Sequence, residues 1–223
     1  ADLGSAKEIV DATGKLVLPG GIDSHVHISQ PSGPDIVMAD DFASATRSAA
    51  FGGNTMVLPF AMQQKGQSLR EVVTEYHKTA DGQCYLDVSF HLIISNPDAQ
   101  MLGQELPALV KDGYTSFKVF MTYDRLKVDD EPLLDVLVAA RRAGAMVCVH
   151  AENHGMIAWM GRRLIEAGHR APKFHALSHP RGSEAEAINR VHPDVRQSRF
   201  RLLLAGAERR IKEGRFALSL ADL

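Results

Sequence analysis

The chain is poor in the features that mark nucleic-acid or membrane proteins. Only 6% of its 223 residues are aromatic, so a broad surface for stacking bases is not expected. Its 25 Lys and Arg are balanced by 27 Asp and Glu, which leaves no basic excess for phosphates or anionic lipids. No apolar run approaches the length of a membrane span. A globular protein that acts on a small molecule is the simplest expectation.

Cysteine is also scarce. The two cysteines, Cys84 and Cys148, each lie in an apolar, strand-like run. This setting favours small buried side chains over a disulfide framework, and hence a reducing compartment. We therefore expect a cytoplasmic protein.

The sequence is rich in alternating strand and helix patterns. Helical patterns lie near residues 41–51, 69–79, 100–111, 131–143 and 155–167. Alternation with short loops predicts parallel strands joined by right-handed crossovers. The five strands expected are Ile22–Ile28, Thr55–Pro59, Tyr85–Ile94, Ser116–Met121 and Ala145–His150.

Both a doubly wound sheet and a (β/α)₈ barrel satisfy this alternation. The barrel is favoured because polar residues fall at the ends of several strands, where barrel enzymes assemble their catalytic groups. No Gly-x-Gly-x-x-Gly follows the first strand, so the dinucleotide-binding fingerprint is missing. The predicted fold class is α/β, an incomplete (β/α)₈ TIM barrel with about five β/α units.

Three segments are predicted along the chain. Residues 1–20 carry two short strands, at 8–11 and 15–18, and are interpreted as the remnant of a small β domain. Residues 21–190 hold the barrel units. Residues 191–223 form an atypical Arg-rich tail, with a helix expected at 196–213 and a short strand at 216–220.

The sharpest motif is a His-x-His pair in the first barrel strand. Side chains two apart in a strand share a face, so His25 and His27 project together, while Ile22, Val26 and Ile28 turn to an apolar layer. Two adjacent imidazoles are suited to bind a metal. The alternative is a core histidine beside a surface one.

Lys118 is the second unusual feature, because apolar residues flank it within a strand. A lysine that blunts an edge strand is one reading. The other is a buried amine with a lowered pKa, which can add carbon dioxide to form a carbamate. Such a carbamate can bridge two cations about 3.5–4 Å apart.

His150 closes another apolar strand and is a plausible ligand, although a loop or capping histidine is equally compatible with the pattern. His25, His27, Lys118 and His150 come from three strands and are expected at one rim of the barrel. Their joint occurrence favours a metal site over coincidence.

Four runs together resemble the hydantoinase/dihydropyrimidinase family of cyclic amidohydrolases. The resemblance covers about residues 5–190, in order and with compatible spacing. The runs are Leu18–His27, Ser116–Met121, Val149–Asn153 and the His-Pro-x-x-x-Glu-x-Glu-Ala motif at 179–187.

The resemblance implies a hydrolase that opens hydantoin or dihydropyrimidine rings to N-carbamoyl amino acids. It implies two divalent metal ions, typically zinc in this family, bound by His25, His27 and His150 and bridged by carboxylated Lys118. It also assigns to Tyr123 the hydrogen bond to the substrate carbonyl; an ordinary loop tyrosine is the alternative. A homo-oligomer is expected.

The sequence departs from the family pattern in its last part. A histidine after a sixth strand and an aspartate after an eighth, both implied by the resemblance, are not found. We therefore expect weak metal binding, poor turnover and association through uncovered strand edges. Two alternatives stay open: a dihydroorotase- or allantoinase-type enzyme, and a catalytically inactive relative that acts only in assembly.

Overall fold

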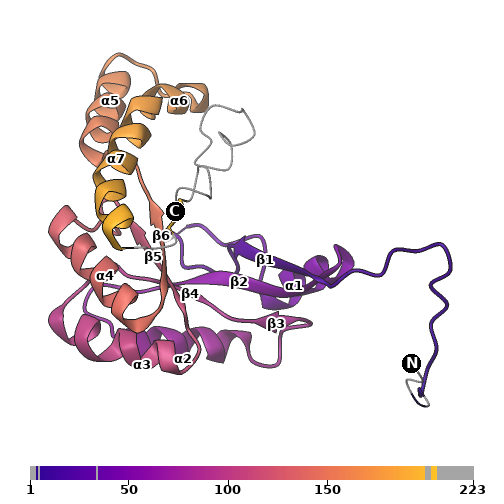
Figure 1. Cartoon of the computed structure of the whole chain (residues 1–223). Coiled ribbons are helices and arrows are strands. Elements are labelled where there is room, and N and C mark those ends of the chain that lie inside the picture. Colours follow the sequence, from indigo (N-terminus) through magenta and orange to yellow (C-terminus); the bar gives the residue numbers. More distant parts are fainter. Residues whose placement is uncertain (1–3, 5, 34, 199–201, 205–223) are drawn as a thin grey trace.

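The fold is built on a parallel sheet with helices packed along it (Figure 1). The computed structural model describes residue 4 and residues 6–33, 35–198 and 202–204. Within these residues, seven strands form a sheet of order β1-β2-β4-β5-β6-β7, with β3 beside β2. Every pairing is parallel, as the alternation predicted.

The five barrel strands predicted from the sequence form close to their expected positions, with one exception. The run expected at 85–94 divides into two strands, because its first part pairs with β2 at Met56 and Val57 and its second part pairs with β2 from Phe60 onwards. The strands are β1 (Gly21–Val26), β2 (Asn54–Met62), β3 (Asp87–Val88), β4 (His91–Ile93), β5 (Ser116–Phe120), β6 (Met146–His150) and β7 (Leu202–Leu204).

The first five predicted helices also form near their expected positions, except at 100–111, and the sequence analysis missed the helices at 175–178 and 181–198. At 100–111 a π-helical turn, Met101–Glu105, precedes a short α-helix, because Pro107 has no N–H to continue the regular ladder. The α-helices are α1 (Phe42–Phe51), α2 (Leu69–Ala80), α3 (Leu106–Lys111), α4 (Asp130–Ala143), α5 (His154–Glu166), α6 (His175–Ser178) and α7 (Arg181–Ser198). None of the helices in the described part of the chain is long and apolar enough to span a membrane.

The core lies between the sheet and helices α2, α3 and α4, which Figure 1 shows together along one flank. Leu92, Phe117 and Val149 of the central strands are completely buried and meet Leu106 and Val136 in the same cluster. Burial of large apolar side chains contributes roughly 1.5–3 kcal/mol each. This packing fixes the strands whose carboxyl ends carry the polar residues.

Helix α2 begins with a reciprocal cap. The Ser68 hydroxyl accepts from the Glu71 N–H at 3.1 Å, and the Glu71 carboxylate accepts from the Ser68 N–H at 3.0 Å. We expect Ser68→Ala to lower the free energy of unfolding by about 1 kcal/mol, because the Glu71 N–H loses its acceptor. Urea denaturation measures this. Thr79→Ala in the last turn of the same helix is the control, with a change within about 0.5 kcal/mol; equal losses would contradict the capping role.

Two strands predicted before β1 do not form. The structure describes residues 6–20 without strand pairing, so the expectation for 8–11 and 15–18 is wrong for the chain as it folds here. Ile9 and Leu16 are 88% and 89% exposed. A strand needs a partner, and in the described structure this segment has none. Its assignment as a remnant of a small β domain remains a prediction.

After residue 190, the residues that the structure describes differ from the predicted tail. Helix α7 crosses that boundary and ends at Ser198, and β7 then pairs with β6. The sequence analysis missed β7. Because β7 lies within the helix expected at 196–213, that expectation is wrong at 202–204. The strand expected at 216–220 and the other residues of that helix beyond Ser198 lie outside the described residues.

Candidate metal centre

The predicted ligands from β1 and β5 meet around one aromatic ring. Phe60, on the strand between them in space, lies with its ring centroid 4.7 Å from that of His25 and 5.1 Å from that of His27. The amine nitrogen of Lys118 lies 5.6 Å from the same centroid. The structure therefore brings His25, His27 and Lys118 together; strand alternation predicted the pairing of the two histidines, and the position of the strand ends at one rim predicted their meeting with Lys118.

The His-x-His pair is held with one nitrogen of His27 already engaged. The two ring centroids are 5.6 Å apart. Nδ1 of His27 is 2.5 Å from Oε1 of Gln30, which can only accept, so Nδ1 carries the proton and Nε2 keeps its lone pair. A hydrogen bond of this kind fixes the tautomer of a metal-binding histidine.

The opposite face of β1 is only partly the apolar layer that was expected. Ile28 is buried, but Ile22 is 62% exposed. The expectation for Ile22 was wrong because β1 is an edge strand in the described sheet and its first residues are not covered by a helix.

Lys118 is buried at the centre of the sheet, with 2% of its surface exposed. Strand β5 lies between β4 and β6, which excludes the edge-strand interpretation. The amine contacts aromatic rings, 5.1 Å from the Phe120 centroid in addition to Phe60. Burial lowers the pKa of Lys118 to about 8, so more of the amine is neutral and nucleophilic than in an exposed lysine.

His150 lies at the end of β6, with its ring stacked on Phe120 at a centroid distance of 5.5 Å. Its Nε2 donates to Oε2 of Glu152 at 2.7 Å, which leaves the lone pair on Nδ1. The hydrogen bond from His150 is also the main reason why the pKa of Glu152 is lowered. Phe120 thus links His150 to Lys118, as Phe60 links Lys118 to the histidine pair.

Tyr123 lies in the loop after β5, and its ring contacts His150 at 5.1 Å. Its backbone has a φ of 72°, which is strained for a non-glycine residue and is held by hydrogen bonds from Leu126 and Lys127 to the Tyr123 carbonyl. Burial, with a contribution from Glu152, raises the pKa of Tyr123. The hydroxyl therefore stays protonated and able to donate at neutral pH.

The donor set suits a divalent cation only when Lys118 is included. Within the described residues, no three His, Cys, Asp or Glu side chains are grouped so as to hold a metal ion. His27 and His150 each present one lone-pair nitrogen, and a lysine carbamate adds two oxygens. Imidazole and carboxylate-type oxygen are suitable ligands for zinc.

His91 is a residue of this site that the sequence analysis missed. It is buried, and its ring lies 4.9 Å from Phe60. Nε2 donates to the Ser24 carbonyl at 2.8 Å, so Nδ1 accepts from the Ser116 hydroxyl at 2.6 Å. His91 therefore ties the backbone next to His25 to the first residue of β5. A histidine within an apolar, strand-like run was the sequence feature that could have indicated a buried, hydrogen-bonded side chain here.

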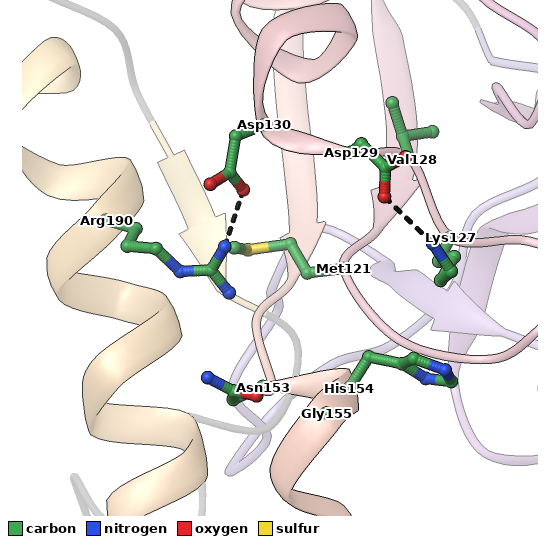
Figure 2. Close-up of a pocket in the computed structure, with 9 residues that line it drawn as sticks. All are labelled: Met121, Lys127, Val128, Asp129, Asp130, Asn153, His154, Gly155 and Arg190. Carbon is green, nitrogen blue, oxygen red and sulfur yellow. Dashed lines mark hydrogen bonds and ion pairs between the residues drawn. The ribbon is translucent and has the colours of Figure 1, made fainter. Parts of the chain in front are cut away.

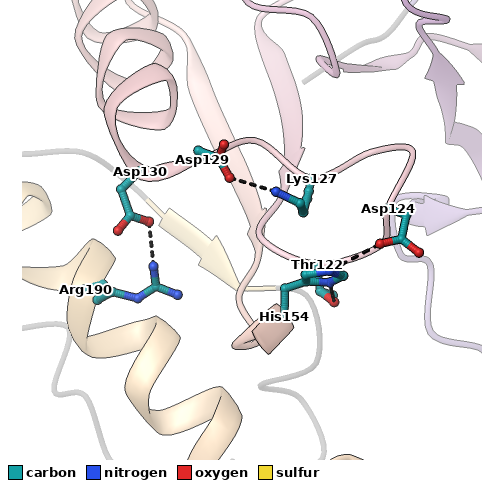
Figure 3. A network of polar contacts seen from close by, with 7 residues as sticks. All are labelled: Thr122, Asp124, Lys127, Asp129, Asp130, His154 and Arg190. Carbon is teal, nitrogen blue, oxygen red and sulfur yellow. Dashed lines mark hydrogen bonds and ion pairs between the residues drawn. The ribbon is translucent and has the colours of Figure 1, made fainter. Parts of the chain in front are cut away.

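A separate small cavity, of about 260 Å³, lies behind this rim (Figure 2). Its charged groups are paired with one another: Arg190 with Asp130 at 2.6 Å and Lys127 with Asp129 at 2.8 Å (Figure 3). This network joins the loop after β5 to α4 and α7. Because these charges are mutually satisfied, we interpret it as a structural junction.

Tyr123 faces a larger cavity, of about 1380 Å³. The loops after β1, β2 and β5 line it, together with α5 and α6. The carboxyl end of a parallel sheet is the place where barrel proteins bind their ligands. Of the predicted site residues, Tyr123 lines this cavity, whereas His25, His27, Lys118 and His150 are not among its described lining residues.

A parallel half-barrel sheet with polar side chains gathered at its carboxyl rim is typical of the barrel hydrolases. The profile of the Amidohydrolase family matches residues 16–218, and the chain belongs to this family. The match extends past residue 190. The predicted fold class, an incomplete TIM barrel, is confirmed.

Individual relatives agree with the resemblance found in the sequence. The D-hydantoinase of Geobacillus stearothermophilus is 44% identical over 189 residues, which are 84% of this chain and 40% of that protein. The dihydropyrimidinase of Dictyostelium discoideum is 39% identical over 186 residues, which are 82% of this chain and 37% of that protein. The predicted kinship with hydantoinases and dihydropyrimidinases is confirmed.

Solved structures give the same result. The dihydropyrimidinase from Brevibacillus agri NCHU1002 superposes with a TM-score of 0.85 at 37% identity, covering 96% of this chain and 48% of that one. The chain thus spans about two fifths of the length of the curated relatives it matches and about half of this structure.

Proposed function

We propose that this chain carries the cyclic-amide hydrolase chemistry of the hydantoinases and dihydropyrimidinases. The reaction opens a hydantoin or dihydropyrimidine ring to an N-carbamoyl amino acid. The observation that carries the proposal is the meeting of His25, His27 and Lys118 around Phe60, at the rim where Tyr123 lines a large cavity.

In this proposal His25, His27 and His150, together with Lys118 as a carbamate, would hold two divalent cations. Bound zinc would supply a Lewis acid for the amide carbonyl and would acidify water. The neutral Lys118 amine adds carbon dioxide and releases a proton to form the carbamate. Its burial between two aromatic rings, without an acidic partner in the described part of the chain, favours this uncharged amine.

The chain's own residues orient the reacting groups. Gln30 and Glu152 fix the tautomers of His27 and His150, and His91 holds the backbone beside His25. The Tyr123 hydroxyl donates a hydrogen bond to the carbonyl oxygen as negative charge develops on it. Its raised pKa keeps this proton available.

We expect Tyr123→Phe to lower kcat about 10²-fold, because one oxyanion donor is lost, while zinc content stays unchanged. Steady-state kinetics together with metal analysis measure both. Tyr85→Phe is the control, since Tyr85 is 67% exposed and lies outside the site. An unchanged kcat for Tyr123→Phe would remove this residue from the reaction.

The direct test combines zinc loading in bicarbonate with a ring-opening assay of the full chain on hydantoin and dihydrouracil. We expect N-carbamoyl product above the metal-only blank, at a rate below the ordinary enzyme value of about 10 s⁻¹. Dihydroorotate and allantoin serve as competing substrates, and faster opening of either would favour that related activity. A folded chain that binds zinc without any turnover would instead support the inactive relative.

Two further expectations belong to the proposal. The free Cys84 and Cys148 are consistent with a reducing compartment, and we propose the cytoplasm. We also propose a homo-oligomer, because β1 presents an edge and Trp159 and Leu177 are 54% and 55% exposed. Sedimentation of the full chain tests the second point.

A further inference from the structure

The large cavity beside Tyr123 is lined by more basic than acidic side chains, and we call these basic side chains its basic wall. Five of the residues that line it bear cationic or protonatable side chains: Lys65, Arg125, His154, His175 and His179. They come from the loop after β2, the loop after β5, α5, and α6 with the residue that follows it. Segments far apart in the sequence thus bring basic groups to the same cavity.

The two acids near this wall, Asp124 and Glu152, each contact a histidine. Asp124 is the one acid among the described lining residues, and its carboxylate lies 3.2 Å from Nε2 of His154 (Figure 3). Glu152 lies near His175 and His179, but it accepts the hydrogen bond from His150. Within the described residues, neither carboxylate makes an ion pair with Lys65 or Arg125, the two permanent cations of the wall.

Lys65 and Arg125 are those permanent cations. Both are exposed, and within the described residues neither side chain makes a hydrogen bond or an ion pair. Both cations are therefore available to pair with an anion bound in the cavity. Met62, Leu126 and Ile157 line the same cavity and offer apolar contacts to a small ring.

We propose that this basic wall binds a carboxylate carried on the ring substituent, so that the preferred substrates are cyclic amides with an acidic side chain. The inference rests on the proposed function, since it names the substrate class of that site. The product of ring opening also carries a carboxylate, formed from the amide that is cleaved. We propose that the wall binds the carboxylate of the substituent, and the experiment below distinguishes it from the carboxylate of the product.

The experiment is a calorimetric titration of the full, zinc-loaded chain with three probes. They are a hydantoin with an acetate substituent, a hydantoin with an ethyl substituent, and N-carbamoylglycine as the product carboxylate. We expect the acetate probe to bind about fivefold more tightly than the ethyl probe, as for two partly exposed charge pairs. Added salt should reduce the difference.

Charge reversal supplies the decisive comparison. Lys65→Glu combined with Arg125→Glu should abolish the preference for the acetate probe. Lys78→Glu with Arg141→Glu makes the same change in net charge at exposed positions that do not line the cavity, and should preserve it. Equal binding of the acetate and ethyl probes, or equal loss in both double variants, would overturn the inference. The inference would also be overturned if the Lys65→Glu and Arg125→Glu variant lost affinity only for N-carbamoylglycine, because the wall would then bind the product carboxylate.

A parallel ring-opening assay separates this inference from the function it rests on. If no hydantoin is opened but the acetate preference depends on Lys65 and Arg125, the carboxylate site stands and the hydrolase proposal fails. If both hydantoins are opened and bound equally well, the hydrolase proposal stands and the acidic-substrate inference fails.

Discussion

Replacing Lys118 by Met is expected to abolish zinc binding at the bridged site and to lower ring opening at least 10²-fold, without destabilising the fold. The buried amine has no acidic partner in the described structure, so an apolar side chain of similar length removes a desolvation cost. A melting temperature that is unchanged or higher, together with lost zinc, separates a ligand from a packing residue.

The carbamate itself can be detected independently of turnover. The wild-type chain in isotopically labelled bicarbonate should show a carbamate signal that is missing in Lys118→Met. Lys127→Met is the matched control, because Lys127 is partly exposed and pairs with Asp129. A carbamate signal that survives in Lys118→Met, or zinc affinity equal to that of the wild type, would eliminate Lys118 as the bridge.

The second large effect is expected at Phe60, whose ring contacts three predicted site residues. Phe60 is 2% exposed, so Phe60→Ala should lower the free energy of unfolding by about 3–5 kcal/mol. Phe60→Leu keeps much of the apolar volume and should cost less than about 1.5 kcal/mol. It should still weaken zinc binding, because the flat surface against which His27 stacks is gone.

Urea denaturation and zinc titration against a chromophoric chelator measure the two effects for Phe60. Phe51→Ala is the control for loss of a ring, since Phe51 is 85% exposed and its removal should change stability by no more than about 0.5 kcal/mol. If Phe60→Leu binds zinc as tightly as the wild type, the ring does not organise the site.

Much of the fold could be predicted because it depends on local patterns. The runs around Lys118 and His150 alternate with amphipathic helices, and β5 and β6 form within a residue of the predicted bounds. The strand alternation also placed His25 and His27 on one face. These features follow from the geometry of the backbone, which is the same for any chain with that pattern.

What could not be predicted depends on partners distant in sequence. Residues 8–11 have strand composition but remain unpaired, whereas Leu202–Leu204 pair with β6. Composition alone does not say whether a partner strand is present. His91 was overlooked for a similar reason, since its role depends on Ser24 and Ser116, which only the sheet brings to it.

The sequence by itself determined the order of strands and helices, the family resemblance and the residue types available for metal chemistry. The tertiary structure decided which of them meet: Phe60 and Phe120 connect Lys118 to residues more than thirty positions away along the chain. It also decided that Lys65 and Arg125 face one cavity. Local propensity acts over a few residues, whereas burial and charge act between whatever side chains the packed sheet brings together.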